Sequence, residues 1–72
     1  MISKELLKKY SVGTKEDYKS EKQVYIEFLK QTDYLASKLA EGLITKEDKA
    51  EEFEARQFCR DEINRLESEE NK

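Results

Sequence analysis

The sequence predicts an all-α protein: an antiparallel helical hairpin with a short N-terminal helix, associating with itself in the manner of a coiled coil. Three observations support this prediction. The 72 residues include no proline and only two glycines, and 43% of them are charged, a composition typical of long exposed helices. Apolar residues recur at spacings of three and four. A chain this short buries only roughly 60% of its unfolded surface, so association is expected to support a thin core.

Residues 1–13 are expected to form a short N-terminal helix or an arm. Ser3 is a suitable N-cap, Leu6 and Tyr10 fall on one side, and Gly13 can adopt the positive φ that ends a helix. Because a helix this short is unstable in isolation, a frayed arm is the alternative.

The helical hairpin is predicted over residues 14–67. Its first helix is expected over residues 15–42, between a cap at Thr14 and a stop at Gly42. At about 100° per residue, most of its apolar side chains share one broad face. That face consists of Tyr18, Val24, Tyr25, Phe28, Leu29, Leu35, Leu39 and Leu43.

The triplet Thr32-Asp33-Tyr34 interrupts a run of good helix formers. Threonine and aspartate compete for backbone hydrogen bonds and favour helix caps over helix interiors. We expect the helix to continue through the triplet, and a break or kink at Thr32-Asp33 is the alternative.

The second long helix is predicted from Lys46 to about Glu67, with Thr45 as its N-cap. Residues 68–72 contain no apolar side chain and are expected to form a disordered tail. The predicted core of the hairpin consists of Phe28, Leu35, Leu39, Phe58, Cys59, Ile63 and Leu66.

The geometry of such a hairpin predicts which residues set its register. Residues whose numbers total about 89 lie at the same height, so Asp33 is level with Arg56. Asp33, together with Tyr34, is placed to accept a charge-assisted hydrogen bond from Arg56 or Arg60. If both arginines are instead solvated, an exposed ion pair contributes only ~0–1 kcal/mol.

Tyr18, Tyr25 and Ile26 are the candidate interface residues, because they lie beyond the height that the second helix covers well. Ile26 and Tyr34 also fall outside the main apolar face. They are either ordinary exposed residues or part of a second contact surface.

We expect no catalytic, cofactor-binding or metal site. The chain has no histidine, which removes the common zinc constellations, and its single Cys59 falls on the apolar face as a small buried thiol. The carboxylate pairs Glu47/Glu51 and Asp48/Glu52 are interpreted as a solvated face, and the two isolated glycines form no phosphate-binding loop. The sequence therefore predicts a non-enzymatic protein that works without a cofactor.

The charge of the chain bears on its partners and location. A net charge of −3 argues against general nucleic-acid binding, which needs a basic surface. No apolar stretch of signal-peptide or membrane-span length is present, so no membrane partner is expected and a cytoplasmic location is the default.

Two strings in the C-terminal half, FLKQTDYLASKLAEG and EARQFCRDEINRLE, resemble the closing segment of short phage and prophage proteins that are often encoded among tail genes. Some of those proteins are described as tail assembly chaperones or tail-associated accessory proteins. The resemblance covers residues 28–67. The matching positions are Thr32, Asp33, Tyr34, Lys38, Glu41, Arg56, Arg60, Ile63, Asn64, Leu66 and Glu67.

The resemblance implies a small phage or prophage protein that acts by helix-mediated protein binding in tail assembly or as a structural accessory. Its partner would be a second copy of the chain, or another phage or host protein. Its location would be the cytoplasm of the bacterial host cell or the virion. The alternative function is a small acidic regulatory binder that inhibits a host protein by covering a basic surface.

Overall fold

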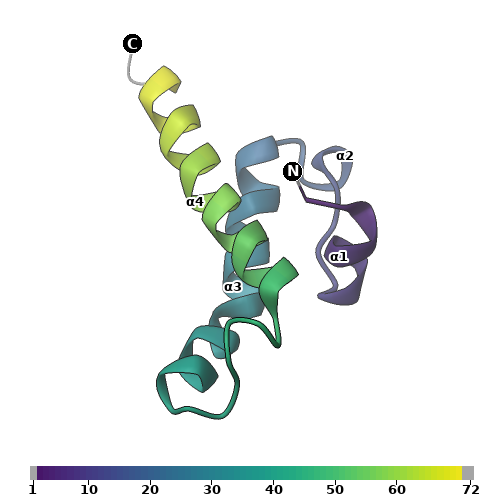
Figure 1. Cartoon of the computed structure of the whole chain (residues 1–72). Helices are drawn as coiled ribbons and strands as arrows, with labels where there is room; N and C mark the ends of the chain where they lie inside the picture. The colour runs from purple at the N-terminus through teal and green to yellow at the C-terminus, as the bar shows by residue number, and fades with distance from the viewer. Residues whose placement is uncertain (1, 71–72) are drawn as a thin grey trace.

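The computed structural model describes residues 2–70, and this part of the chain contains helices and connections but no strand. Its elements are α1 (Lys4–Lys9), α2 (Lys15–Tyr18), α3 (Glu21–Ala40) and α4 (Ala50–Glu70). The two long helices α3 and α4 pack against each other, and α1 and α2 lie together on one side of them (Figure 1). The all-α class is therefore confirmed.

Helix α1 begins where predicted and ends before the predicted glycine. The Ser3 hydroxyl accepts a hydrogen bond from the Leu6 N–H at 3.1 Å, as an N-cap does. At the other end Ser11 adopts a φ of 59°, and the Val12 N–H donates to the Leu7 carbonyl at 2.9 Å. A residue with this left-handed backbone conformation commonly ends an α-helix; it is usually a glycine, and here it is a serine.

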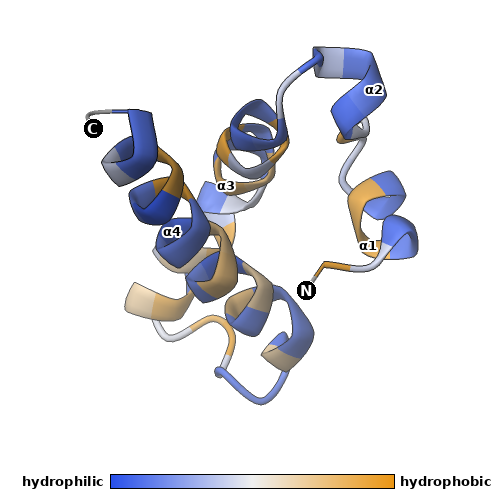
Figure 2. Cartoon of the chain, turned by 90° about the horizontal axis from the view of Figure 1, so that it is seen from above, coloured by the Kyte–Doolittle hydropathy of each residue, from blue (hydrophilic) through white to orange (hydrophobic). Residues whose placement is uncertain are grey.

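The predicted helix over residues 15–42 is wrong at its beginning, because the structure divides it into α2 and α3. Lys19 adopts a left-handed φ of 58°, and Ser20 then caps α3 by accepting a hydrogen bond from the Gln23 N–H at 3.4 Å. The break turns the chain back on itself, so the N-terminal segment lies beside the two long helices (Figure 1). Helix α2 is mainly hydrophilic and contributes no buried residue (Figure 2).

Helix α3 continues without interruption through Thr32-Asp33-Tyr34, as predicted. The Thr32 hydroxyl donates to the Phe28 carbonyl at 2.7 Å, so it bonds within the helix and does not cap a new one. The helix ends at Ala40, and Gly42, just beyond the cap residue Glu41, has a φ of 77°, while the Leu43 N–H donates to the Lys38 carbonyl at 2.9 Å. This stop is the one that the sequence predicts.

Helix α4 begins later and ends later than predicted. Thr45 and Asp48 exchange hydrogen bonds at 2.8 and 3.2 Å, but they close a turn, and α4 starts only at Ala50. At its far end α4 reaches Glu70, where Arg65 forms ion pairs with carboxylates three residues before it and four after it. The predicted disordered tail is thus helical over 68–70, and residues 71–72 lie outside the described part.

Two ion pairs between the long helices show their register, one near an end of the pair and one near the middle. Lys22, near the start of α3, lies 3.6 Å from Glu67, and Asp33 lies 3.1 Å from Arg56 near the middle. The residue numbers in each pair total 89, the value predicted for antiparallel helices at the same height.

The core lies where α1, α3 and α4 meet. Of the predicted core residues, Phe28, Leu35 and Cys59 are fully buried, whereas Leu39, Phe58, Ile63 and Leu66 are only partly buried. The N-terminal segment supplies much of the remainder, so it is not a frayed arm. The buried cluster consists of Leu6, Leu7, Val12, Val24, Tyr25, Phe28, Ala55 and Cys59.

Candidate functional site

A charged side chain lies buried between the two long helices. Arg56, on α4, donates from Nη1 to the Leu29 carbonyl at 2.9 Å and to the Thr32 hydroxyl at 2.6 Å. Its Nη2 donates to Asp33 Oδ1 at 3.1 Å. All three acceptors come from neighbouring turns of α3, so the planar guanidinium specifies one position of α4 along α3.

The predicted ion pair of Asp33 with Arg56 is therefore confirmed, but it is the outer part of the contact. The Asp33 side chain is 70% exposed, whereas Thr32 is fully buried. The role of Thr32 was not predicted, because a threonine inside a helix usually forms its hydrogen bond with the backbone of its own helix. Because Asp33 is exposed, solvent screens its charge, and its ion pair with Arg56 contributes less to stability than the buried hydrogen bond of Thr32.

The other two predicted register residues are wrong. Tyr34 is 48% exposed, and the ammonium of Lys38 lies 5.4 Å from the centre of its ring. Arg60 is exposed and donates to the side-chain oxygen of Gln57 at 2.9 Å, within its own helix. Tyr34 and Arg60 fail because each is rotated around its helix away from the facing helix.

Replacing Thr32 with valine is expected to lower the free energy of unfolding by about 1–3 kcal/mol. Valine keeps the shape of the side chain but leaves the buried guanidinium of Arg56 short of one acceptor. Asp33→Ala is expected to cost only ~0–1 kcal/mol, because Asp33 is exposed. Urea unfolding followed by circular dichroism measures both losses, with Thr32→Ser as the control that retains the hydroxyl. A larger loss for Asp33→Ala than for Thr32→Val would contradict this assignment.

A second buried charge joins α1 to α4. Glu52 was expected on a solvated face, yet its side chain is only 5% exposed. The Tyr10 hydroxyl donates to Glu52 Oε2 at 2.6 Å, the Lys9 ammonium lies 3.4 Å from the same oxygen, and that of Lys49 lies 3.9 Å away. The expectation fails because the returning N-terminal segment covers this carboxylate and supplies its donors.

These contacts change the pKa of Glu52. Burial acts to raise it, but the hydrogen bonds from Tyr10, from the backbone of Glu52 itself and from Lys9, together with the positive charge of Lys9, outweigh burial. The pKa therefore lies below its ordinary value of 4.5. A carboxyl group whose pKa is lowered by folding stabilises the folded state above the unfolded pKa. That contribution is lost as the pH falls through the folded pKa.

We therefore expect Glu52→Gln to reduce the pH dependence of stability on the acid side. The wild-type protein should lose more free energy of unfolding than the variant as the pH falls from about 7 to about 3. Urea titrations at a series of pH values compare the two proteins, and Glu51→Gln, at an exposed position, is the matched control. If the free energy of unfolding depends on pH in the same way for the wild type and for Glu52→Gln, the pKa of Glu52 is not lowered by its partners.

The candidate interface residues Tyr18, Tyr25 and Ile26 are partly or fully covered by other residues of the same chain. Tyr25 is wrong as an exposed contact: it is 9% exposed, its ring packs edge-on against Phe58 at 5.6 Å, and its hydroxyl donates to Glu21 at 2.7 Å. Tyr18 and Ile26 are half-buried. The folded-back N-terminal segment accounts for this, since it shares the core cluster with Tyr25. An interface role for Tyr18 and Ile26 stays a prediction.

The thiol of Cys59 is fully buried, and burial raises its pKa to about 12. A thiol with this pKa remains protonated near neutral pH and is a poor nucleophile. Residues 2–70 contain no group of three or more histidine, cysteine, aspartate or glutamate side chains arranged to hold a metal ion.

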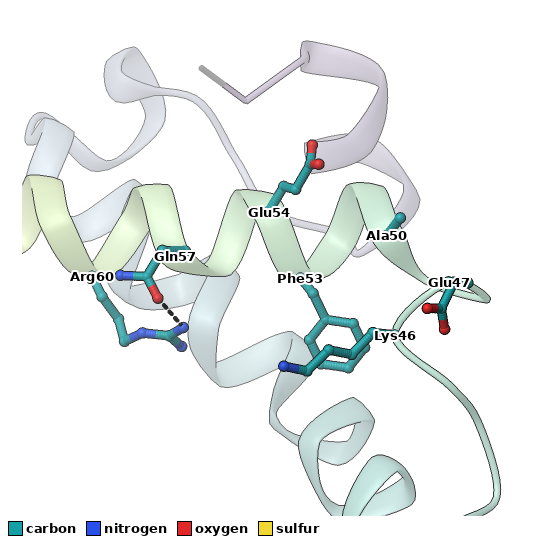
Figure 3. A pocket seen from close by; sticks show the side chains of 7 residues that line it. All are labelled: Lys46, Glu47, Ala50, Phe53, Glu54, Gln57 and Arg60. Atoms are coloured by element: carbon teal, nitrogen blue, oxygen red, sulfur yellow. Dashed lines mark hydrogen bonds between the residues drawn. The ribbon is translucent and has the colours of Figure 1, made fainter.

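An open groove of about 450 Å³ is lined by α4 and by the turn that precedes it. We call it the α4 groove; its lining residues are Lys46, Glu47, Ala50, Phe53, Glu54, Gln57 and Arg60. Figure 3 shows Phe53 in the middle of the groove, with Glu47 and Ala50 toward one end and Arg60 at the other. Leu43, in the connection that precedes the groove, is 65% exposed.

No family model, no curated protein and no solved structure matches this chain. The fold and its contacts define a small all-helical protein. A buried arginine on α4 specifies the register of the two long helices, and a buried glutamate on α4 binds the N-terminal segment. Among the described residues, no helix has the length and the apolar character needed to cross a lipid bilayer.

Proposed function

We propose that the protein acts by helix-mediated protein binding, as a small non-enzymatic accessory or assembly protein of a phage or prophage. In this proposal α3 and α4 form a rigid helical hairpin that associates through an apolar face in the manner of a coiled coil. The partner is a second copy, or another phage or host protein, in the bacterial cytoplasm or on the virion. The tail-assembly attribution rests on the resemblance of residues 28–67 to tail-associated proteins.

The observation that supports binding is the α4 groove. It places the ring of Phe53 in a partly exposed position on a helix whose rotation and height are specified by Arg56. A preorganised helix face loses little conformational entropy when a partner helix packs on it, which favours binding.

The acidic surface of α4 favours a second candidate function, an inhibitor that covers a basic patch on a host protein. Exposed carboxylates occur along the whole helix. Those near its end pair with Lys22 or Arg65, whereas Glu51, Glu54 and Asp61 take part in no ion pair within residues 2–70. Such binding would be steered by charge and weakened strongly by salt, whereas packing of apolar helix faces would depend weakly on salt. The exposed acidic residues of α4 are Glu51, Glu54, Asp61, Glu67, Glu69 and Glu70.

Sedimentation equilibrium of the purified protein tests the proposed function. We expect a defined oligomer whose molar mass changes little between about 0.1 M and about 1 M salt. A folded monomer at every concentration would contradict self-association. Capture of a basic host protein by that monomer, reversed by salt, would favour the inhibitor instead.

A further inference from the structure

We propose that the α4 groove is the contact surface of a two-fold symmetric dimer, in which a second copy packs its own α4 across the groove in the opposite direction. This inference rests on the proposed function, because it names the surface and the partner of helix-mediated binding. It follows from the order of side chains along the groove, from Glu47 at one end, through Phe53, to Arg60 at the other (Figure 3).

The groove is complementary to itself when the two helices run antiparallel. A two-fold axis near Phe53 places Ala50 of each copy opposite Gln57 of the other, since the numbers of these two α4 residues total 107. It also brings the turn that carries Glu47 to the end of the partner's groove where Arg60 lies (Figure 3). The axis then falls between Phe53 and Glu54, so the two Phe53 rings lie next to each other on either side of it. A two-fold contact of this kind uses one patch twice, so each complementary pair occurs twice.

A parallel arrangement of the same faces is disfavoured by charge. It would set Glu47 beside Glu47 and Arg60 beside Arg60, and like charges placed opposite each other in an interface are strongly unfavourable. The antiparallel arrangement replaces both repulsions with attractions. The charges at the two ends of the groove therefore favour the antiparallel arrangement of the two copies.

The side chains at the two ends of the groove are available for this contact. Glu47 and Arg60 are both exposed. Within residues 2–70 the guanidinium of Arg60 is bound only to the amide of Gln57, at 2.9 Å, and takes part in no ion pair. These two charges can thus pair between copies without first breaking an ion pair within one copy.

A dimer through this face would cover a modest part of the molecular surface. A specific dimer buries roughly 600–800 Å² on each partner, a modest part of the 5148 Å² exposed by one chain. The groove extends from Lys46 to Arg60, and the exposed Leu43 lies just before it in the chain. The apolar contribution comes from Phe53 and Ala50, and the charged ends set the orientation.

A charge-reversal series tests the dimer, with sedimentation equilibrium of the full chain as the measurement. Glu47→Arg and Arg60→Glu each place like charges opposite one another, so each is expected to weaken dimerisation by about tenfold or more. The double variant Glu47→Arg with Arg60→Glu restores opposite charges and is expected to recover the dimer. Because Glu47 and Arg60 lie at opposite ends of the groove, recovery reports a contact between two copies. Circular dichroism shows that each variant is folded.

Two outcomes would overturn the inference. If the wild type forms an oligomer that neither single reversal weakens, the protein self-associates through another surface, and the proposed function survives without this dimer. If the wild type stays monomeric up to about 1 mM, both the dimer and self-association are wrong. Glu51→Arg, at an exposed position outside the groove lining, is the matched control and is expected to leave the dimer unchanged.

Discussion

Replacing Phe28 with alanine is expected to lower the free energy of unfolding by about 3–5 kcal/mol. Phe28 is fully buried in the core cluster, and its ring meets that of Tyr10 edge-on at 5.9 Å. Alanine removes the apolar surface and leaves a cavity that the surrounding helices fill only partly. The free energy of unfolding is typically about 0.05–0.15 kcal/mol per residue, so a chain of 72 residues has only about 4–11 kcal/mol in total. The variant should therefore be close to unfolding at physiological temperature.

Thermal and urea unfolding followed by circular dichroism measure this loss. Leu43→Ala is the matched control, because Leu43 is 65% exposed and its truncation is expected to change stability by no more than about 0.5 kcal/mol. Equal losses for the two variants would mean that Phe28 does not occupy the centre of the core.

Arg56→Ala is expected to cost about 2–5 kcal/mol, the range for truncating a long buried side chain. Arg56 is 8% exposed and makes its three hydrogen bonds to Leu29, Thr32 and Asp33 across the interface of the long helices. Alanine removes both the stem that packs between the helices and the guanidinium that specifies their register.

Arg56→Met separates packing from hydrogen bonding. Methionine keeps an unbranched stem of similar length, and the Thr32 hydroxyl still donates to the Phe28 carbonyl, so no buried donor is left without a partner. Since a buried charge also loses its hydration on folding, methionine is expected to cost no more than about 1.5 kcal/mol. If Arg56→Met and Arg56→Ala lose the same free energy of unfolding, the stabilising contribution of Arg56 comes from its hydrogen bonds. A negligible loss for alanine would show that the contact between α3 and α4 does not need this side chain.

Several helix ends were predictable because their signals are local. The Ser3 cap and the Gly42 stop act over four or five residues of chain, and both occur where the sequence predicts them. The break before α3 also had a local signal that the sequence analysis did not use. Ser20 followed by Gln23 is the spacing of a capping box, and Ser20 is the cap that begins α3.

The register of the long helices was predicted from chain geometry, but the group that specifies it was only partly identified. A common height for Asp33 and Arg56 follows from two helices and one connection, and the structure contains this pair. That Thr32 accepts the shorter hydrogen bond depends on how far each helix is rotated about its own axis. Rotation is set by packing, because a difference of one residue turns a side chain by about 100°.

The sequence alone was sufficient for the all-α class, the continuity of α3 through its Thr-Asp-Tyr triplet and the height at which Asp33 meets Arg56, because caps, periodicity and helix rise act over a few residues. The buried state of Glu52 and the covered position of Tyr25 arise only when the N-terminal segment folds back over α3 and α4. Tyr10 and Glu52 are 42 residues apart in the chain, and no local pattern specifies a contact over that separation. Tertiary packing decides such contacts, because a carboxylate is buried only where distant segments bring donors to it.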